Sequence, residues 1–128
     1  MRLLLDTHTL IWAMRNDDRL SEIARSAISH LGNEGYVSVI SVWEAATKHR
    51  NGKLAEAAPL VNNPARVLTA LGFLTLPLQL EHARLAGTLV SPHKDPFDRM
   101  LAAQALLEGL TLVSNDAAFD TLLAPRLW

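Results

Sequence analysis

The 128-residue chain contains no cysteine, and this absence excludes two kinds of site. Disulfide bonds cannot form, and thiolates cannot hold a metal ion. Any metal site in the protein must therefore use oxygen or imidazole ligands. The lack of cysteine is compatible with a reducing environment, and we expect a cytoplasmic protein.

Long apolar runs and an excess of positive charge are also missing. No stretch reaches the roughly 20 apolar residues that a membrane helix needs, and Asp6 interrupts the first apolar run. We therefore expect neither a signal peptide nor a membrane partner. The formal net charge is −1, so no basic field over the whole surface indicates a nucleic-acid binder. A nucleic-acid site would have to be local.

The composition that remains is typical of a globular protein. Hydrophobic residues make up 49% of the chain and charged residues 20%, a balance found in folded rather than disordered sequences. The length is near the commonest domain size, and no repeat, low-complexity segment or linker divides the sequence. We expect residues 1–128 to form a single domain.

Short apolar segments alternate with helical patterns along the chain. Residues 3–5 form a compact apolar run, after which Leu10, Ile11 and Met14 recur on one helical face. Alternating strands and helices predict an α/β fold, with a mostly parallel sheet covered by helices on both faces. The further strands are predicted at residues 36–40, 73–76 and 110–113, with a short edge strand in 124–128. The further helices are predicted at about 21–31, 41–50, 65–71, 80–89, 96–108 and 114–123.

Acidic residues stand just beyond three of the predicted strands. Asp6 follows the first strand, Glu44 the second and Asp116 the fourth. Asp98 opens the helix predicted at 96–108 and shares a face with its apolar residues, so its carboxylate should point toward the sheet. Ligands bind at the carboxyl ends of parallel strands. If the first, second and fourth strands are neighbours, the four carboxylates meet at that edge.

Helix capping offers an alternative explanation for each of these acids. Asp6 and Asp116 stand at helix starts, and Asp95 precedes Pro96, which suits the first position of a helix. Glu44 has the spacing of a capping box with Ser41. Capping does not, however, require an acid at nearly every strand-to-helix junction. Converging carboxylates repel one another unless a cation neutralises them, and we therefore favour a cation site.

Oxygen ligands suit Mg²⁺ or Mn²⁺, and such an ion can activate a water for attack on a phosphodiester. Lys48 lies four residues after Glu44, so it can form an intrahelical ion pair or contact a phosphate. Three histidines, His8, His82 and His93, are scattered, and none is predicted to be a ligand. Other candidates for contacts with a phosphate backbone are Arg50, Lys53 and Arg99. Thr7 and Ser114 are candidates for orienting a metal-bound water.

Four segments, taken in order, resemble the PIN-domain ribonucleases, and most closely the VapC-like toxins of toxin–antitoxin pairs. They are Leu3–Trp12, Ser38–Lys48, Asp95–Ala105 and Leu112–Asp116. The resemblance implies an α/β/α sandwich and Mg²⁺- or Mn²⁺-dependent cleavage of RNA. It also implies a homodimer and a cognate antitoxin whose tail occupies the acidic groove.

The resemblance assigns the site residue by residue. It implies that Asp6, Glu44, Asp98 and Asp116 are the four catalytic, metal-binding acids. Asp95 is typical of this subgroup, and we expect it to cap the helix or to support the ligands rather than to bind the ion.

Two other functions remain open from the sequence. A strand-end aspartate followed by threonine also occurs in phosphoryl-transfer enzymes, where the aspartate is the nucleophile. Against this alternative, His8 occupies the position where such enzymes commonly carry a second aspartate. The other alternative is a PIN-like interaction module that has lost catalysis, although the complete acidic set argues against it.

Overall fold

A five-stranded sheet forms the middle of the computed structural model, which describes residues 1–128. Its strands are β1 (Arg2–Leu5), β2 (Glu34–Ser38), β3 (Leu74–Leu76), β4 (Thr111–Val113) and β5 (Arg126–Leu127). They lie in the order β3-β2-β1-β4-β5, and every neighbouring pair is parallel. The central strand is β1, in which Leu4 pairs with Tyr36 on one side and Leu112 on the other.

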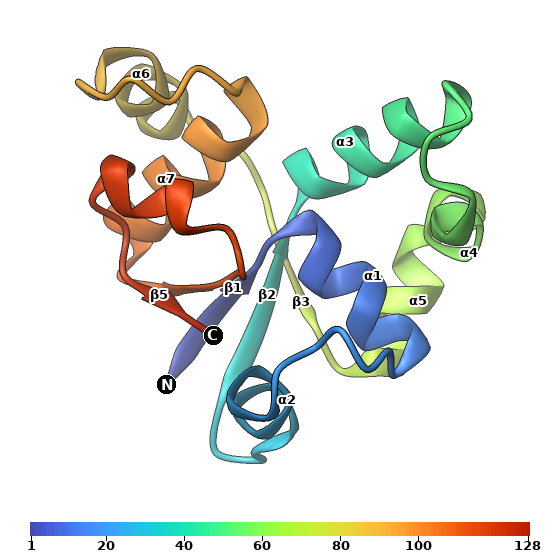
Figure 1. Ribbon diagram of the computed structural model, residues 1–128. Coiled ribbons are helices and arrows are strands. Elements are labelled where there is room, and N and C mark those ends of the chain that lie inside the picture. The colour runs from blue at the N-terminus through green and yellow to red at the C-terminus, as the bar shows by residue number, and fades with distance from the viewer.

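Helices cover both faces of this sheet, with α6 and α7 on one side and α1, α4 and α5 on the other (Figure 1). The predicted three-layer α/β/α sandwich is therefore confirmed. The longest helix has 13 residues, and no helix meets the length and apolarity needed to cross a membrane. The α-helices are α1 (Thr7–Arg15), α2 (Glu22–Ser29), α3 (Val39–Arg50), α4 (Ala58–Asn62), α5 (Pro64–Leu71), α6 (Leu80–Thr88) and α7 (Pro96–Glu108). Two 3₁₀ helices, η1 (Ala55–Ala57) and η2 (Ala117–Leu122), complete the elements.

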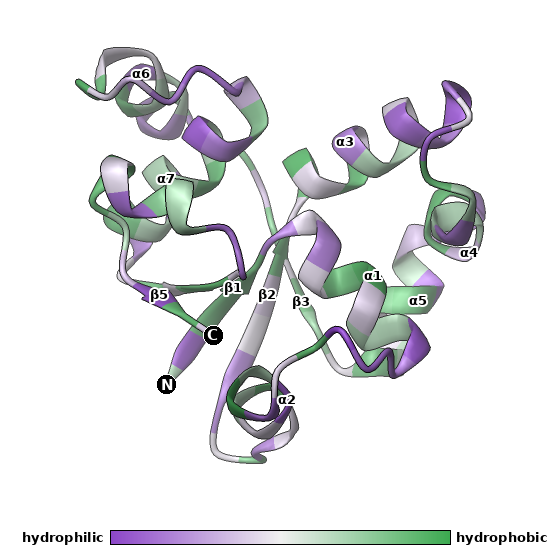
Figure 2. Ribbon diagram, in the orientation of Figure 1, coloured by the Kyte–Doolittle hydropathy of each residue, from purple (hydrophilic) through white to green (hydrophobic).

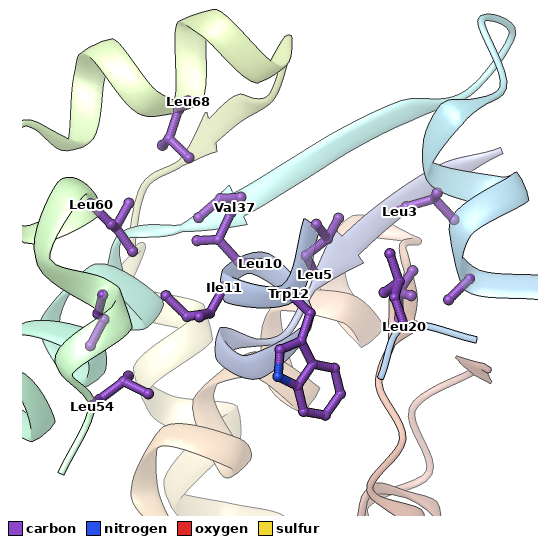
Figure 3. Packing of buried hydrophobic residues seen from close by; sticks show 14 residues of the cluster. Leu3, Leu5, Leu10, Ile11, Trp12, Leu20, Val37, Leu54, Leu60 and Leu68 are labelled. Atoms are coloured by element: carbon purple, nitrogen blue, oxygen red, sulfur yellow. The ribbon is translucent and has the colours of Figure 1, made fainter. Parts of the chain in front are cut away.

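The hydrophobic core is divided by the sheet into two clusters. Side chains alternate along β1, so Leu3 and Leu5 enter one cluster and Leu4 enters the other. All three leucines are buried, as expected for a parallel strand covered on both faces. Figure 3 shows Leu10 and Ile11 of α1 in the first cluster with Leu5. The side chains of β1 on this face of the sheet therefore pack with those of α1.

The boundary between β2 and α3 differs from the prediction. The strand covers Glu34–Ser38 and the helix begins at Val39, so the predicted strand at 36–40 starts and ends two residues too late. Ser38 is the N-cap, and its hydroxyl accepts the N–H of Ile40 at 3.1 Å. The predicted capping box of Ser41 with Glu44 is wrong, since both residues lie inside the helix. β-Branched residues favour strands locally, but Ile40 is buried in the second core cluster as a helical residue, so packing decides the boundary.

Candidate active site

A pocket of about 540 Å³ collects residues from the end of β1 and α1, from α3, from the start of α7 and from the segment after β4. Half of its ten lining residues are acidic and one is apolar. All four carboxylates predicted to converge are among them, and so are Thr7, Asp95 and Lys48. The lining residues are Asp6, Thr7, His8, Trp12, Glu44, Lys48, Asp95, Asp98, Asn115 and Asp116.

The strand order explains why these acids share a pocket. β1 lies between β2 and β4, so the residues that follow these three strands emerge side by side. In Figure 1, α1 and α3 both begin at the centre of the view, where β1 and β2 end. Asp6 caps α1 by accepting the Thr9 N–H at 2.8 Å, and Asp116 caps η2 by accepting the Ala118 N–H at 2.9 Å. Capping and a place in the pocket therefore coexist in the same residues.

Glu44 lies one turn inside α3, and both of its carboxylate oxygens have partners. Oε1 accepts the Thr7 hydroxyl at 2.5 Å, and Oε2 accepts the Lys48 ammonium at 2.6 Å. The Glu44 side chain is almost fully buried, whereas that of Lys48 is about one-third exposed. The intrahelical ion pair considered for Lys48 is thus present, and Thr7 fixes the orientation of Glu44.

Asp98 is paired with His93, which was not predicted to belong to the site. His93 Nε2 lies 2.7 Å from Asp98 Oδ2, and both side chains are about four-fifths buried. Asp95 caps α7, because its Oδ1 accepts the N–H groups of Phe97 and Asp98. A signal for His93 existed in the sequence, since it lies five residues before Asp98 in the loop that enters the same helix.

Two of the carboxyl groups are electrostatically costly to ionise. Burial raises the pKa of Asp6 above its ordinary value, and hydrogen bonds from Ser114 and Thr9 offset part of the increase. Burial also raises the pKa of Asp98 to about 6. The negative charges of Asp95 and Glu44 act in the same direction on Asp98, whereas the hydrogen bond with His93 lowers the pKa. A cation in this pocket would relieve the cost of the negative charge.

The chemistry of the donors fits a hard divalent cation, because the acidic lining supplies only oxygen ligands. No three acidic or histidine side chains are grouped closely enough to form a ready-made metal site. A fully closed cage is not required for Mg²⁺, which keeps several waters and commonly takes one or two carboxylates directly. The residues that would hold the ion are Asp6, Glu44, Asp98 and Asp116.

The remaining polar candidates, Ser114, Arg50, Lys53 and Arg99, differ in their exposure and in their partners. Ser114 is buried, and its hydroxyl accepts the N–H of Asp116 at 3.0 Å. The C-terminal end of α3 is hydrophilic (Figure 2). Arg50 is the last residue of α3 and Lys53 lies in the loop after it; both are exposed but do not line the pocket. Arg99 is not retained as a phosphate contact, because its guanidinium donates to three backbone carbonyls within residues 86–93.

Three lining residues were not assigned to the site from the sequence. They are His8, Trp12 and Asn115. Trp12 is 7% exposed and also belongs to the first core cluster. His8 and Asn115 lie two residues or fewer from a predicted acid, so nearness in sequence was the available signal.

Comparisons with known proteins agree with the fold. VapBC2 from Rickettsia felis, solved bound to a DNA fragment from their promoter, has a TM-score of 0.69 and 16% identity, with 99% of this chain and 98% of that chain covered. FitAcB from Neisseria gonorrhoeae has a TM-score of 0.68 and 20% identity over 98% and 96% of the two chains. VapBC-1 from nontypeable Haemophilus influenzae has a TM-score of 0.65 and 16% identity over 99% and 97%. No curated protein sequence matches the chain.

At such low identities the solved structures establish the fold alone. The sequence model of the PIN domain family, however, matches residues 3–122. This match spans all four segments on which the resemblance was based. The chain belongs to the PIN domain family.

Proposed function

We propose that this protein is a Mg²⁺- or Mn²⁺-dependent endoribonuclease and the toxin of a toxin–antitoxin pair. The observation that carries the proposal is the meeting of Asp6, Glu44, Asp98 and Asp116, from separate parts of the chain, in one pocket. Burial makes two of these groups costly to ionise, which favours a cation as their partner. PIN domains are generally nucleases, so the family supports the same chemistry.

The four acids are the proposed metal ligands, and each is oriented by the chain. Thr7 and Lys48 fix Glu44, and helix capping fixes Asp6 and Asp116. When bound, the ion supplies an activated water and stabilises charge on the phosphoryl oxygens. Without a cation the same pocket would repel a phosphodiester.

The basic residues of α3 and the loop after it are the proposed contacts for the RNA backbone. Lys48 lines the pocket, and Arg50 and Lys53 extend the positive charge beyond it along an exposed surface. Phosphate contacts from such residues position the substrate but do not read its sequence. These contacts therefore do not determine which RNA sequence is cleaved.

The proposed protein partners follow from the family resemblance. Similar chains are known from VapBC and FitAB structures, and we propose a cognate antitoxin that covers the acidic pocket. A homodimer and a cytoplasmic location belong to the same proposal.

RNA cleavage by the purified protein tests the function directly. We expect cleavage of single-stranded RNA in Mg²⁺ or Mn²⁺, and none in EDTA. Asp6→Asn should abolish cleavage without unfolding the protein, because the amide oxygen can still cap α1. Asp18→Asn is the matched control, since Asp18 is exposed and outside the pocket. Full activity of Asp6→Asn would remove Asp6 from the mechanism.

The two alternatives give different results in the same preparation. A phosphoryl-transfer enzyme would yield a phosphoaspartyl intermediate trapped at Asp6. An interaction module without catalysis would leave RNA intact at every metal concentration. Neither alternative is favoured by a specific contact in the pocket.

A further inference from the structure

We propose that His93 is a positioning residue for Asp98 and that Arg99 holds the loop carrying this histidine in place. The proposal rests on the proposed function, since it takes Asp98 to be a metal ligand. It adds a residue that contacts no metal or substrate but determines how one carboxylate is presented to the pocket.

The first observation is the contact between the two side chains. His93 Nε2 and Asp98 Oδ2 are 2.7 Å apart. Asp98 lines the pocket, whereas His93 is not among the lining residues. The imidazole therefore contacts the carboxylate from outside the pocket lining. A hydrogen bond to Oδ2 restricts rotation of the carboxylate and determines how Oδ1 is oriented.

The second observation is that the loop around His93 is fixed by one side chain of α7, that of Arg99. Arg99 Nε donates to the carbonyl of Ala86 at 2.8 Å, and its Nη1 donates to the carbonyl of His93 at 2.8 Å. Its Nη2 donates to the carbonyl of Leu89. One guanidinium thus joins the end of α6, the loop and the start of α7. Such planar, multi-donor contacts are specific to arginine.

The third observation is that His93 is held on its other sides as well. The backbone N–H of His93 donates to the Ser91 hydroxyl at 3.2 Å. That hydroxyl forms a hydrogen bond with Thr121 Oγ1 at 3.0 Å. The imidazole lies 6.4 Å from the ring of Phe119, measured between centroids. Both backbone polar groups and the ring of His93 are therefore engaged. An imidazole restrained in this way can hold Asp98 with little loss of its own conformational freedom.

A second histidine–carboxylate pair, between α6 and α7, provides a comparison. His82 Nε2 lies 2.8 Å from Glu108 Oε1 and joins α6 to α7. Neither residue lines the pocket, so this pair lies outside the proposed metal site. The His93 pair differs because its carboxylate is one of the acids crowded into the pocket. Partners of ligating carboxylates commonly matter about 10–100-fold in metal affinity.

Mn²⁺ affinity of the full chain, measured by isothermal titration calorimetry and by electron paramagnetic resonance, tests the proposal. His93→Phe keeps a ring but removes the donor, and we expect Mn²⁺ affinity to fall about 10–100-fold. His93→Gln places an amide N–H near the original Nε2 and should restore most of the affinity. Glu108→Leu removes the acceptor of the comparison pair and should leave affinity unchanged.

Two outcomes would overturn the role of His93. One is wild-type Mn²⁺ affinity in His93→Phe, and the other is an equal loss in His93→Gln, which would show that the hydrogen bond is not the cause. Unfolding temperature in EDTA checks that each variant is folded. Arg99→Lys keeps the charge but cannot make the three contacts, so its affinity should also fall. Unchanged affinity there would remove Arg99 from the proposal.

Asp98→Asn separates failure of this inference from failure of the proposed function. If Asp98→Asn binds Mn²⁺ as well as the wild type, Asp98 is not a ligand and the proposed metal site is wrong. If Asp98→Asn loses Mn²⁺ while His93→Phe retains it, the metal site stands and only the positioning role is wrong.

Discussion

The Lys48 ammonium lies 2.6 Å from Oε2 of Glu44, one helical turn before it on α3. Glu44 is buried and its other oxygen accepts the Thr7 hydroxyl. The Lys48 ammonium is therefore the group that balances the charge of this carboxylate within the protein. Lys48 also lines the pocket. It therefore places a fixed positive charge among the proposed metal ligands, where it competes with an ion for Glu44.

Replacing Lys48 by methionine should separate its stabilisation of buried Glu44 from its competition with a metal ion for the same carboxylate. Lys48→Met leaves a buried carboxylate without its cation, and we expect the unfolding free energy in EDTA to fall by about 1–3 kcal/mol. Mn²⁺ should then raise the unfolding temperature of this variant more than that of the wild type, because Glu44 is free to bind the ion. Thermal unfolding with and without Mn²⁺ measures both. Lys53→Met, at an exposed position, is the control, and an identical Mn²⁺ response in both variants would contradict the competition.

The raised pKa of Asp98 predicts a pH dependence of stability in the metal-free protein. Its carboxyl titrates at about 6 when folded, against an ordinary value of 3.8. As pH rises between these values, the unfolded chain loses this proton before the folded protein does, so stability falls. Above pH 6 the carboxyl is ionised in both states, so the loss of stability should level off. We expect a total of about 1–2 kcal/mol, because the partial exposure of Asp98 screens its charge.

Urea unfolding in EDTA measures this decline in stability, at pH values from about 3.5 to about 7.5 in steps of roughly half a unit. Asp98→Asn should remove the Asp98 part of the decline and be more stable than the wild type at neutral pH. A wild-type curve that the substitution leaves unchanged would show that Asp98 titrates normally.

Asp6 is predicted to have two separable roles. Its Oδ1 caps α1 through the Thr9 N–H, and its buried charge is unfavourable without a cation, as the raised pKa indicates. In EDTA, Asp6→Asn should therefore be at least as stable as the wild type. Asp6→Ala should be less stable than Asp6→Asn by about 1 kcal/mol, the usual value of an N-cap. Equal stability of the two variants in urea unfolding would mean that the cap contributes nothing.

Thr7 should stabilise the protein through its hydrogen bond to Glu44. Thr7→Val keeps the shape of the side chain but removes the 2.5 Å contact to Oε1. Loss of a hydrogen bond to a buried charged group costs about 1.5–3 kcal/mol, which urea unfolding can resolve. Thr7→Ser retains the hydroxyl and should lose clearly less. If the serine variant is as unstable as the valine variant, methyl packing rather than the hydrogen bond explains the effect.

Local sequence signals predicted those elements whose ends depend on neighbouring residues. The helix α7 begins at Pro96 after the cap Asp95 and is followed by Gly109, which adopts a φ of +66°. These residue types favour helix ends wherever they occur. The end of β2 was not predictable in this way, because two serines, Ser38 and Ser41, each have a capping side chain. Burial of Ile40 in the second core cluster selects Ser38.

In the candidate site too, neighbouring residues predicted some features and only the tertiary structure decided others. The position of each acid beyond a strand was visible in the sequence, but its place in a common pocket required β1 to lie between β2 and β4. The partners of the site residues were less predictable. Arg99 looked like a phosphate contact and instead binds three carbonyls, and His93 looked isolated and instead contacts Asp98. Such contacts depend on the path of a loop that has no periodic pattern.

The sequence by itself determined the chemistry available to this protein: carboxylates without thiolates, attached to the ends of strands that had to be buried. The tertiary structure decided which of those carboxylates face one another and which polar groups are already engaged. The reason is that periodicity and capping act over a few residues, whereas strand order and loop packing depend on contacts between distant segments. Asp6 was identifiable from its neighbours in the chain, but its meeting with Glu44, Asp98 and Asp116 exists only in the folded protein.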